Sequence, residues 1–398
     1  MKVVKRLTNG YSLTPNLKDK DLINVSPGPT QIGKHLLNKL KEHIGNKYKS
    51  GVTPLEISHR SPEFKKIKDS LDKNIRTFMN IPDDFSLIWT QGGGHGQFSA
   101  VPLNFKRLFP NKPAFYIVSG TWSDRASKEA EKVLPIDTIF SERNLNPLLY
   151  KSIPNVLPDL SSYSYVYLCS NETVNGTEYS ESRFPIPSRD LLGENTKLVV
   201  DMSSDFGTKR IDWDKIDVAF ACSSKNLGTA GSTLLIIRNE LIESFNGNTD
   251  LYIPSILDWK LYSDSDSLYN TPAVFNIYLT DLIFKDYIEK YTDVNKLERI
   301  NYEKANLIYD SIRNNDKLKL CISDEKIQSF MNIPFTVVEN SFNSFIDYCF
   351  ENNIVGLRTK TPFNWKELNT DEPLRISLYN GVSLEETKKI ANLIDNFR

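Results

Sequence analysis

Short apolar runs rich in β-branched and aromatic residues recur along the first 240 residues, with helical patterns between several of them. Runs of this kind are typical of buried strands. Helical stretches at 96–108 and 123–133 separate some of them. Alternation of strand and helix indicates an α/β fold with a mostly parallel sheet. The predicted strands are 86–89, 114–118, 163–168, 197–200, 217–221 and 233–237.

The last hundred residues have a different character. Apolar side chains at helical spacing predict helices around 342–349 and 390–397, the second behind a capping box formed by Ser383 and Glu386. Between them, 374–379 alternates as a half-buried strand. We therefore predict a large α/β domain over 34–297 and a smaller α+β domain made of 1–33 together with 298–398.

Charge and scarce residues exclude several classes of protein. The chain has 49 Lys and Arg against 50 Asp and Glu, a net charge of −1 that argues against nucleic-acid or membrane-surface binding. No apolar stretch approaches the roughly 18 residues of a membrane span, and the N-terminus lacks the apolar segment of a signal peptide. Four scattered Cys and four His show no metal-ligand spacing. We expect a cytoplasmic protein without a metal.

A glycine-rich segment at 90–98 follows one predicted strand and precedes a predicted helix. Glycines let the backbone approach a ligand closely, and the first turn of a helix presents free N–H groups to an anion. The segment matches neither the P-loop nor the dinucleotide-binding pattern. It is a candidate phosphate site, and a glycine turn for tight packing is the alternative.

Asp201 ends one apolar run and Lys225 follows another. Taken alone, Asp201 is as consistent with a helix cap or a turn as with a functional role. A single lysine between two strands is more often a solvated turn residue. Together with the glycine segment they form the three parts that a pyridoxal-phosphate site requires: a lysine for a Schiff base, a carboxylate for the ring nitrogen and a phosphate cradle. Trp122 follows a predicted strand and is a candidate for stacking on the ring, with core packing as the alternative.

From residue 24 to the C-terminus, ordered segments resemble the phosphoserine aminotransferases, a family of the class V aminotransferase group with fold type I. The segments are 58–61, 92–104, 170–173, 201–204, 224–228, 269–272, 331–335 and 375–380. The resemblance implies a homodimer that binds pyridoxal phosphate. It also implies transfer of an amino group from glutamate to 3-phosphohydroxypyruvate, giving phosphoserine in serine biosynthesis by a ping-pong mechanism.

The resemblance also implies roles for individual residues. Lys225 would bind the cofactor covalently and move the substrate proton, Asp201 would pair with the pyridinium nitrogen, and Trp122 would stack on the ring. Thr173 would hydrogen-bond the ring oxygen. The phosphate of the cofactor would be held by backbone N–H groups of Gly94 and His95, the side chain of Ser224, and the partner subunit's Asn270 and Thr271.

Three residues would bind substrate in the same scheme. His59 and Arg60 would reach the substrate phosphate across the subunit boundary. Arg375 would bind the α-carboxylate, and its place on the strand agrees with this role, because it points away from Leu374 and Ile376.

The chain departs from the family at two places. Ser224 stands where a Gln is usual, and the Gly-His-Arg segment that helps to hold the substrate phosphate is replaced over 356–373, where Arg358 or Lys360 could compensate. An aminotransferase for a different 2-oxo acid is therefore the alternative function. A β-lyase or desulfurase using Cys349, and a scaffold without activity, are less favoured, because Cys349 lies on an apolar helical stripe and both Lys225 and Asp201 are present.

Overall fold

A computed structural model describes residues 21–140, 158–193, 195–245, 251–338, 341–357 and 373–398. Its centre is a seven-stranded sheet in the order β2-β10-β9-β8-β5-β3-β4. All neighbours pair in parallel except β10, which is antiparallel to both β2 and β9. The mostly parallel sheet is therefore confirmed. Its strands are β2 (Phe85–Thr90), β3 (Ala114–Val118), β4 (Ile136–Phe140), β5 (Tyr165–Cys169), β8 (Lys197–Asp201), β9 (Val218–Cys222) and β10 (Thr233–Arg238).

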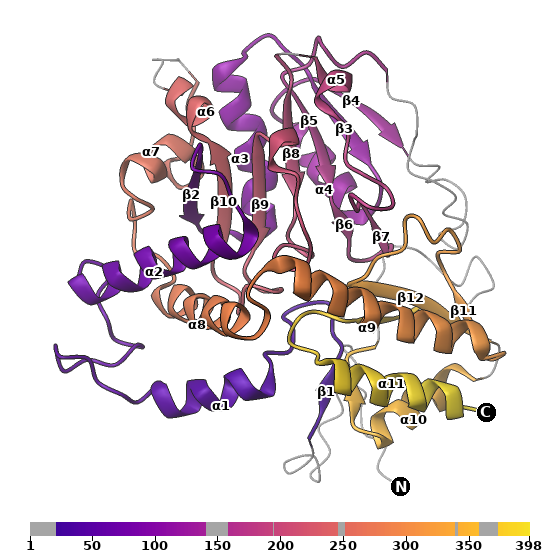
Figure 1. Cartoon of the computed structure of the whole chain (residues 1–398). Coiled ribbons are helices and arrows are strands. Elements are labelled where there is room, and N and C mark those ends of the chain that lie inside the picture. The colour runs from indigo at the N-terminus through magenta and orange to yellow at the C-terminus, as the bar shows by residue number, and fades with distance from the viewer. Residues whose placement is uncertain (1–20, 141–157, 194, 246–250, 339–340, 358–372) are drawn as a thin grey trace, which may run out of the picture.

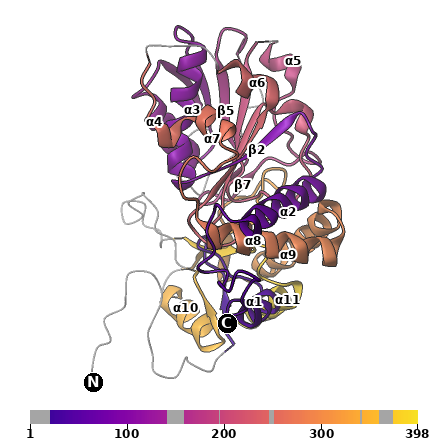
Figure 2. The same ribbon diagram turned by 90° about the vertical axis from the view of Figure 1, so that its left-hand side faces the viewer.

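Each predicted strand run lies in this sheet, and β4 is a strand that the sequence patterns did not indicate. The runs carry apolar residues on both faces because helices cover the sheet on both sides. Within β3, Ile117 packs in one core cluster while Tyr116 and Val118 pack in another. Figure 2 shows helices on either side of the sheet.

The first of these clusters includes residues of α2 (Pro62–Met79) and α8 (Val274–Tyr291), and the second includes residues of α3 (Gly93–Leu108) and α4 (Thr121–Ala130). The helices expected at 96–108 and 123–133 are thus present, and each begins two or three residues earlier. The earlier start of α3 places the glycine segment inside its first turn.

A third cluster unites the C-terminal part with Ile23 and Val25 from near the start of the described chain. Its helices are α9 (Val294–Asn314), α10 (Phe342–Glu351) and α11 (Leu384–Asn396), which gather below the sheet in Figure 1. The capping box of Ser383 and Glu386 is present at the start of α11. The division at residues 33 and 297 stays a prediction, and α9 runs through the second of these positions.

The C-terminal part also contains a three-stranded antiparallel sheet, β11-β12-β14. The expected half-buried strand appears as β14 (Leu374–Ser377), but all four residues are buried, so that expectation is wrong. Leu374 packs in the C-terminal core, whereas Arg375 faces a cavity against the large sheet. Arg375 is buried because the large domain covers the second face of β14, although the alternation of apolar and polar residues predicts that this face is exposed. The partners of β14 are β11 (Leu318–Leu320) and β12 (Asn332–Val337).

The remaining described elements are short or lie at the edges. A two-stranded parallel pair joins β1 (Ile23–Asn24) to β13 (Ile354–Val355), and a hairpin pairs β6 (Asn171–Glu172) with β7 (Thr177–Glu178). Among the described helices, none is both long and apolar enough to cross a membrane. The other helical segments are α1 (Lys34–His43), α5 (Arg189–Leu192), α6 (Asn239–Ser244), α7 (Trp259–Asp264), η3 (Trp213–Lys215) and η4 (Ser255–Leu257).

Candidate active site

A cavity of about 680 Å³ lies beyond the carboxyl ends of the parallel strands. Ligands bind at this edge in open α/β sheets, because the loops that follow the strands converge there. The cavity brings together eight of the residues singled out in the sequence. They are Gly94, His95, Trp122, Thr173, Asp201, Ser224, Lys225 and Arg375.

The glycine segment forms the turn from β2 into α3. Gly92 is the residue before the helix and has φ of 96°, in the left-handed region that favours glycine. A Cβ atom on Gly96 would lie 3.1 Å from the carbonyl oxygen of Gln91, so a side chain would crowd this turn. The first turn of α3 leaves backbone N–H groups without intrahelical acceptors, and Gly94 and His95 of this turn line the cavity. The turn is therefore built to receive an anion.

Asp201 is the last residue of β8 and is buried. Its Oδ1 accepts a hydrogen bond from the backbone N–H of Ser203 at 2.8 Å, and its Oδ2 accepts one from the hydroxyl of Tyr167 at 3.4 Å. Burial raises the pKa of the carboxyl to about 7, and no lysine, arginine or histidine of the described chain forms an ion pair with it. Asp201 is thus a buried carboxylate that faces the cavity and forms no ion pair within the described chain. Such a group suits a ligand that carries its own positively charged N–H.

Lys225 lies in the connection between β9 and β10, with its Nζ 5.6 Å from the ring centre of Tyr379. The Nζ also donates to the carbonyl oxygen of Pro27. A Cβ on Gly28 would lie 2.6 Å from this Nζ, and Gly28 has φ of 142°. Glycine is thus needed for the 26–29 segment to lie against the lysine. A glycine between two prolines is typical of a rigid turn, so the sequence does carry a local signal at this segment.

Trp122 lies in the first turn of α4 and faces the cavity. Its indole meets the imidazole of His95 edge to face, with ring centres 5.8 Å apart, and its Nε1 is buried without a hydrogen-bond partner in the described structure. The backbone N–H groups of Trp122 and Ser123 donate to the two carboxylate oxygens of Glu172 at 2.9 and 2.8 Å. Glu172 therefore fixes this helix terminus, a role that no sequence pattern indicated.

Arg375 reaches the cavity from the C-terminal sheet. Its guanidinium is buried, and one Nη donates to the backbone carbonyl of Thr173. Its Nε has no hydrogen-bond partner in the described structure, and burial lowers its pKa to about 10. A buried guanidinium with an unused donor facing a cavity is suited to bind a carboxylate.

Four predicted residues do not line this cavity: His59, Arg60, Asn270 and Thr271. The amide oxygen of Asn270 accepts a hydrogen bond from Tyr262, and the carbonyl oxygen of Thr271 accepts one from Gln91. Their predicted action across a subunit boundary stays a prediction. Arg358 and Lys360 lie outside the described residues.

The donor set of the cavity fits pyridoxal phosphate. It offers a primary amine at Lys225, a buried carboxylate without a cation at Asp201 and an anion-binding turn at Gly94 and His95. An aromatic face is available at Trp122. These four features match the aldehyde, ring nitrogen, phosphate and ring face of that cofactor.

Comparison with known proteins agrees with this fit. Residues 22–390 match the family model described as aminotransferase class-V. A probable phosphoserine aminotransferase from Caenorhabditis elegans is 34% identical over 379 residues, which cover 94% of this chain and 96% of the relative. Phosphoserine aminotransferase 1, chloroplastic, from Arabidopsis thaliana is 31% identical and covers 95% of this chain and 82% of its own length.

Solved structures show the same relationship. Phosphoserine aminotransferase from Bacillus circulans subsp. alkalophilus aligns with a TM-score of 0.81 at 26% identity, covering 93% of this chain and 96% of that chain. The pyridoxal-phosphate-bound enzyme from Trichomonas vaginalis aligns with a TM-score of 0.81 at 26% identity, covering 94% of this chain and 100% of that chain. The expected fold type I and the resemblance carried by the motifs are thereby confirmed, and the chain belongs to the class-V aminotransferase family.

Proposed function

We propose that this chain is a pyridoxal-phosphate-dependent aminotransferase that forms phosphoserine from 3-phosphohydroxypyruvate and glutamate. The observation that carries the proposal is the convergence of Lys225, Asp201 and the first turn of α3 on one cavity. Relatives that cover nearly the whole chain are named phosphoserine aminotransferases, which supports this substrate over others. The reaction would serve serine biosynthesis.

The cavity residues would hold the cofactor at four points. Gly94 and His95 would donate backbone N–H groups to its phosphate, with the Ser224 hydroxyl beside them. Asp201 would accept a hydrogen bond from the protonated ring nitrogen and keep it protonated, and Trp122 would lie against the ring. The hydroxyl of Thr173 would donate to the ring oxygen. Bound pyridoxal phosphate supplies an electron sink that stabilises negative charge at the α-carbon of the substrate.

Lys225 would move the proton in the reaction. Its Nζ would take the proton from the α-carbon of the amino-acid substrate and return it to the cofactor carbon that carried the aldehyde. Transfer in both directions through one amine explains how two substrates can use the same cavity in turn. Arg375 would hold the α-carboxylate that both substrates share, so that the α-carbon stays within reach of Lys225.

We propose further that the active enzyme is a homodimer. His59 and Arg60 are absent from this chain's cavity, so they would serve the cavity of a second copy, where they would bind the substrate phosphate. Asn270 and Thr271 would reach the cofactor phosphate in the same way. Tyr269, directly before them, has 46% of its surface exposed, and Tyr252 has 81% exposed, as expected of aromatic side chains that a second copy covers.

A different 2-oxo acid is the second candidate substrate. Gly356 lines the cavity, and the segment that differs from the family begins at this residue. An altered segment that begins at the cavity wall can change which side-chain group of the 2-oxo acid is recognised, while the α-carboxylate is bound as before. The names of the plant relatives place them in chloroplasts, and a cytoplasmic location for this chain stays a prediction.

The β-lyase alternative loses its nucleophile. Cys349 is buried in the C-terminal cluster, and burial raises the pKa of its thiol. A thiol that is neutral and enclosed cannot serve as the mobile nucleophile of such an enzyme.

An amino-donor panel tests the proposal. Purified protein with pyridoxal phosphate is given 2-oxoglutarate and either phosphoserine, serine or other amino acids, and kcat/KM is measured for each. We expect phosphoserine to exceed serine by about 10³-fold, because a charged phosphate offers several strong hydrogen bonds that serine lacks. Equal values for the two would overturn the phosphoserine assignment in favour of a different 2-oxo acid.

A further inference from the structure

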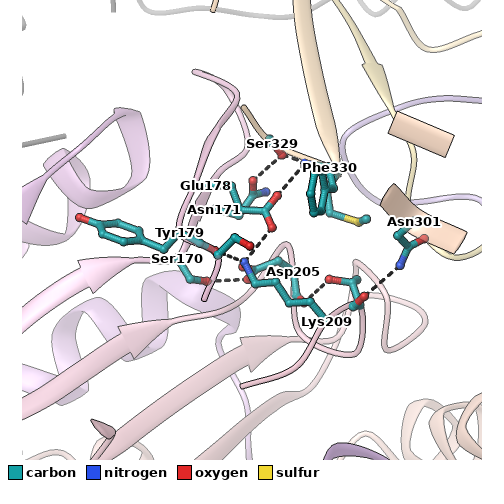
Figure 3. Close-up of polar contacts among 12 residues, drawn as sticks. Ser170, Asn171, Glu178, Tyr179, Asp205, Lys209, Asn301, Ser329 and Phe330 are labelled. Carbon is teal, nitrogen blue, oxygen red and sulfur yellow. Dashed lines mark hydrogen bonds and ion pairs between the residues drawn. The ribbon is translucent and has the colours of Figure 1, made fainter. Parts of the chain in front are cut away.

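Lys209 is a buried lysine that does not line the cavity. The Nζ of Lys209 is 2.8 Å from Oδ2 of Asp205 and 2.8 Å from Oε1 of Glu178, and it also donates to the carbonyl oxygen of Tyr179 (Figure 3). The side chains of Lys209, Asp205 and Glu178 are 9%, 1% and 1% exposed. One buried cation thus stands between two buried carboxylates.

The first carboxylate connects the lysine to Asp201. The hydroxyl of Ser170 donates to Oδ1 of Asp205 at 2.6 Å and lies 3.1 Å from the backbone carbonyl of Asp201. The backbone N–H of Ser170 donates to the same carbonyl at 2.9 Å. The main chain at Asp201 is therefore held by a serine that Asp205 orients. The charge on Asp205 also helps to raise the pKa of Asp201, after the larger effect of burial.

The second carboxylate connects the lysine to the C-terminal part. Oε2 of Glu178 accepts a hydrogen bond from the backbone N–H of Phe330 at 2.6 Å, just before β12. In register, β12 pairs with β14, and Pro334 lies opposite Arg375. Glu178 thereby ties the hairpin β6–β7 to the sheet that carries the proposed carboxylate-binding arginine.

A side branch of this network reaches the cavity wall. The hydroxyl of Ser329 donates to Oδ1 of Asn171, which lines the cavity, and accepts the backbone N–H of Asn332 at 2.9 Å. The amide of Asn332 in turn donates to Ser377 of β14 at 3.0 Å. The contacts around Lys209 thus run continuously from one wall of the cavity to the other.

We propose that Lys209 is a positioning residue that holds Asp201 and the strand of Arg375 in one arrangement by binding Asp205 and Glu178 together. The inference rests on the proposed function, because it assigns Lys209 to the support of Asp201 and Arg375. Replacing Lys209 leaves two buried carboxylates without a cation, so both the geometry and the electrostatic potential at Asp201 change.

The titratable groups around Asp201 set the sign of that change. Tyr167 and Cys169 approach from β5, Glu172 from β6, and Asp205 from the turn after β8. Cys222, Lys225, His95 and Arg375 share the cavity. A more negative potential favours every protonated form in this site. Loss of the lysine and loss of a carboxylate should therefore shift the pH midpoint of the bound cofactor's absorption in opposite directions.

Holoenzyme variants test the proposal through the pH titration of the visible absorption of bound pyridoxal phosphate. In Lys209→Met we expect the pH midpoint to rise by about half a unit or more and cofactor binding to weaken roughly tenfold. In Glu178→Gln, whose amide oxygen can still accept from Phe330, the midpoint should fall. Lys209→Arg should restore the wild-type midpoint, since a cavity of about 20 Å³ beside Lys209 and Asp205 gives room for the larger head group.

Lys68→Met is the matched control. Lys68 is 3% exposed and lies between Asp72 and Asp266 at 2.9 and 2.7 Å, away from the cavity. Both Lys68→Met and Lys209→Met should lose thermal stability, but Lys68→Met should keep the wild-type midpoint. Midpoints that stay unchanged, or that move in the same direction in Lys209→Met and Glu178→Gln, would overturn the proposal.

Failure of a variant to fold and failure of the wild type to bind cofactor have different meanings. If Lys209→Met fails to fold, the fall in midpoint expected for Glu178→Gln carries the test alone. A wild-type protein that binds no cofactor would instead contradict the proposed function, whereas normal wild-type binding with unshifted variants contradicts only the role of Lys209.

Discussion

The two halves of the cavity are built in different ways. In the half proposed for the cofactor, Asp201 and Cys169 are paired partners in adjacent strands, and Lys225 follows the next strand. In the half proposed for the substrate, Arg375 comes from the C-terminal sheet, and His59 and Arg60 lie outside the cavity. The sheet edge thus fixes the reactive groups, while substrate recognition draws on separate regions of the chain. Changes to the first half should affect the reaction with every substrate, and changes to the second half should affect substrate choice.

The largest effect is expected from Lys225→Ala. Because one amine would both bind the cofactor and move the proton, turnover should fall by at least about 10³-fold with any amino donor. Steady-state turnover and the visible absorption of the purified protein measure this loss. Lys68→Ala serves as the control for loss of a lysine, and full turnover in Lys225→Ala would refute the proposed chemistry.

Asp201→Asn separates activity from stability. An amide cannot hold the ring nitrogen in its protonated form, so turnover should fall by about 10²-fold or more while the fold is kept. Rates with phosphoserine and with glutamate should fall together. A loss confined to one of the two substrates would place Asp201 in substrate recognition instead.

The same variant should make the cofactor-free protein more stable at high pH. The folded-state pKa of Asp201 is about 7 against an ordinary value of 3.8, so its ionisation opposes folding. This contribution to stability is complete below about pH 4 and is lost as the pH rises through about 7. Asp201→Asn lacks this loss, and at pH 8 it should exceed the wild type by up to about 4 kcal/mol. Urea unfolding at pH 4 and pH 8 measures the difference, and equal pH dependence in both proteins would contradict the burial effect.

Arg375→Met and Arg375→Lys examine the substrate half. Removal of the guanidinium should raise KM for both amino donor and oxo acid by about 10- to 100-fold, because both carry the α-carboxylate. Lysine should restore only part of the affinity, since it lacks the planar fork. A change in kcat with unaltered KM would show that Arg375 acts on the reaction rather than on binding.

Mixing two inactive variants tests whether a second copy completes the cavity. Chains with Lys225→Ala and chains with Arg60→Met are unfolded together and refolded as a mixture. If Arg60 serves the partner's cavity, one site in each mixed dimer is intact, and about a quarter of the wild-type activity should return. Activity no higher than that of the separate variants would mean that the cavity does not use Arg60 from a partner.

The smallest effect is expected from Ser224→Ala. A single neutral hydroxyl contributes about 1 kcal/mol to binding, so cofactor affinity should weaken by about fivefold. Ser224→Gln, which introduces the residue usual in the family, should bind at least as tightly as the wild type. Spectroscopic titration with pyridoxal phosphate distinguishes the two, and a large loss in Ser224→Ala would show a stronger contact than a neutral hydrogen bond.

Much of the cofactor half could be predicted because its signals are local. Every strand of the large sheet except β4 is a short apolar run, and Asp201 and Lys225 were recognisable from their places after such runs. The contacts that the sequence did not indicate join distant segments. Pro27 lies 198 residues from Lys225, and Glu178 lies 152 residues from Phe330. No spacing rule links positions so far apart.

The sequence by itself determined the elements and the types of reactive residue, because strand and helix periodicity and turn chemistry depend on neighbouring positions. Tertiary structure decided which charges are buried and with what partners. It buried Asp201 with no ion-pair partner among the described residues, set Lys209 between two carboxylates and covered the second face of β14. Burial and electrostatic potential depend on all segments that surround a group, so they follow only from the folded arrangement.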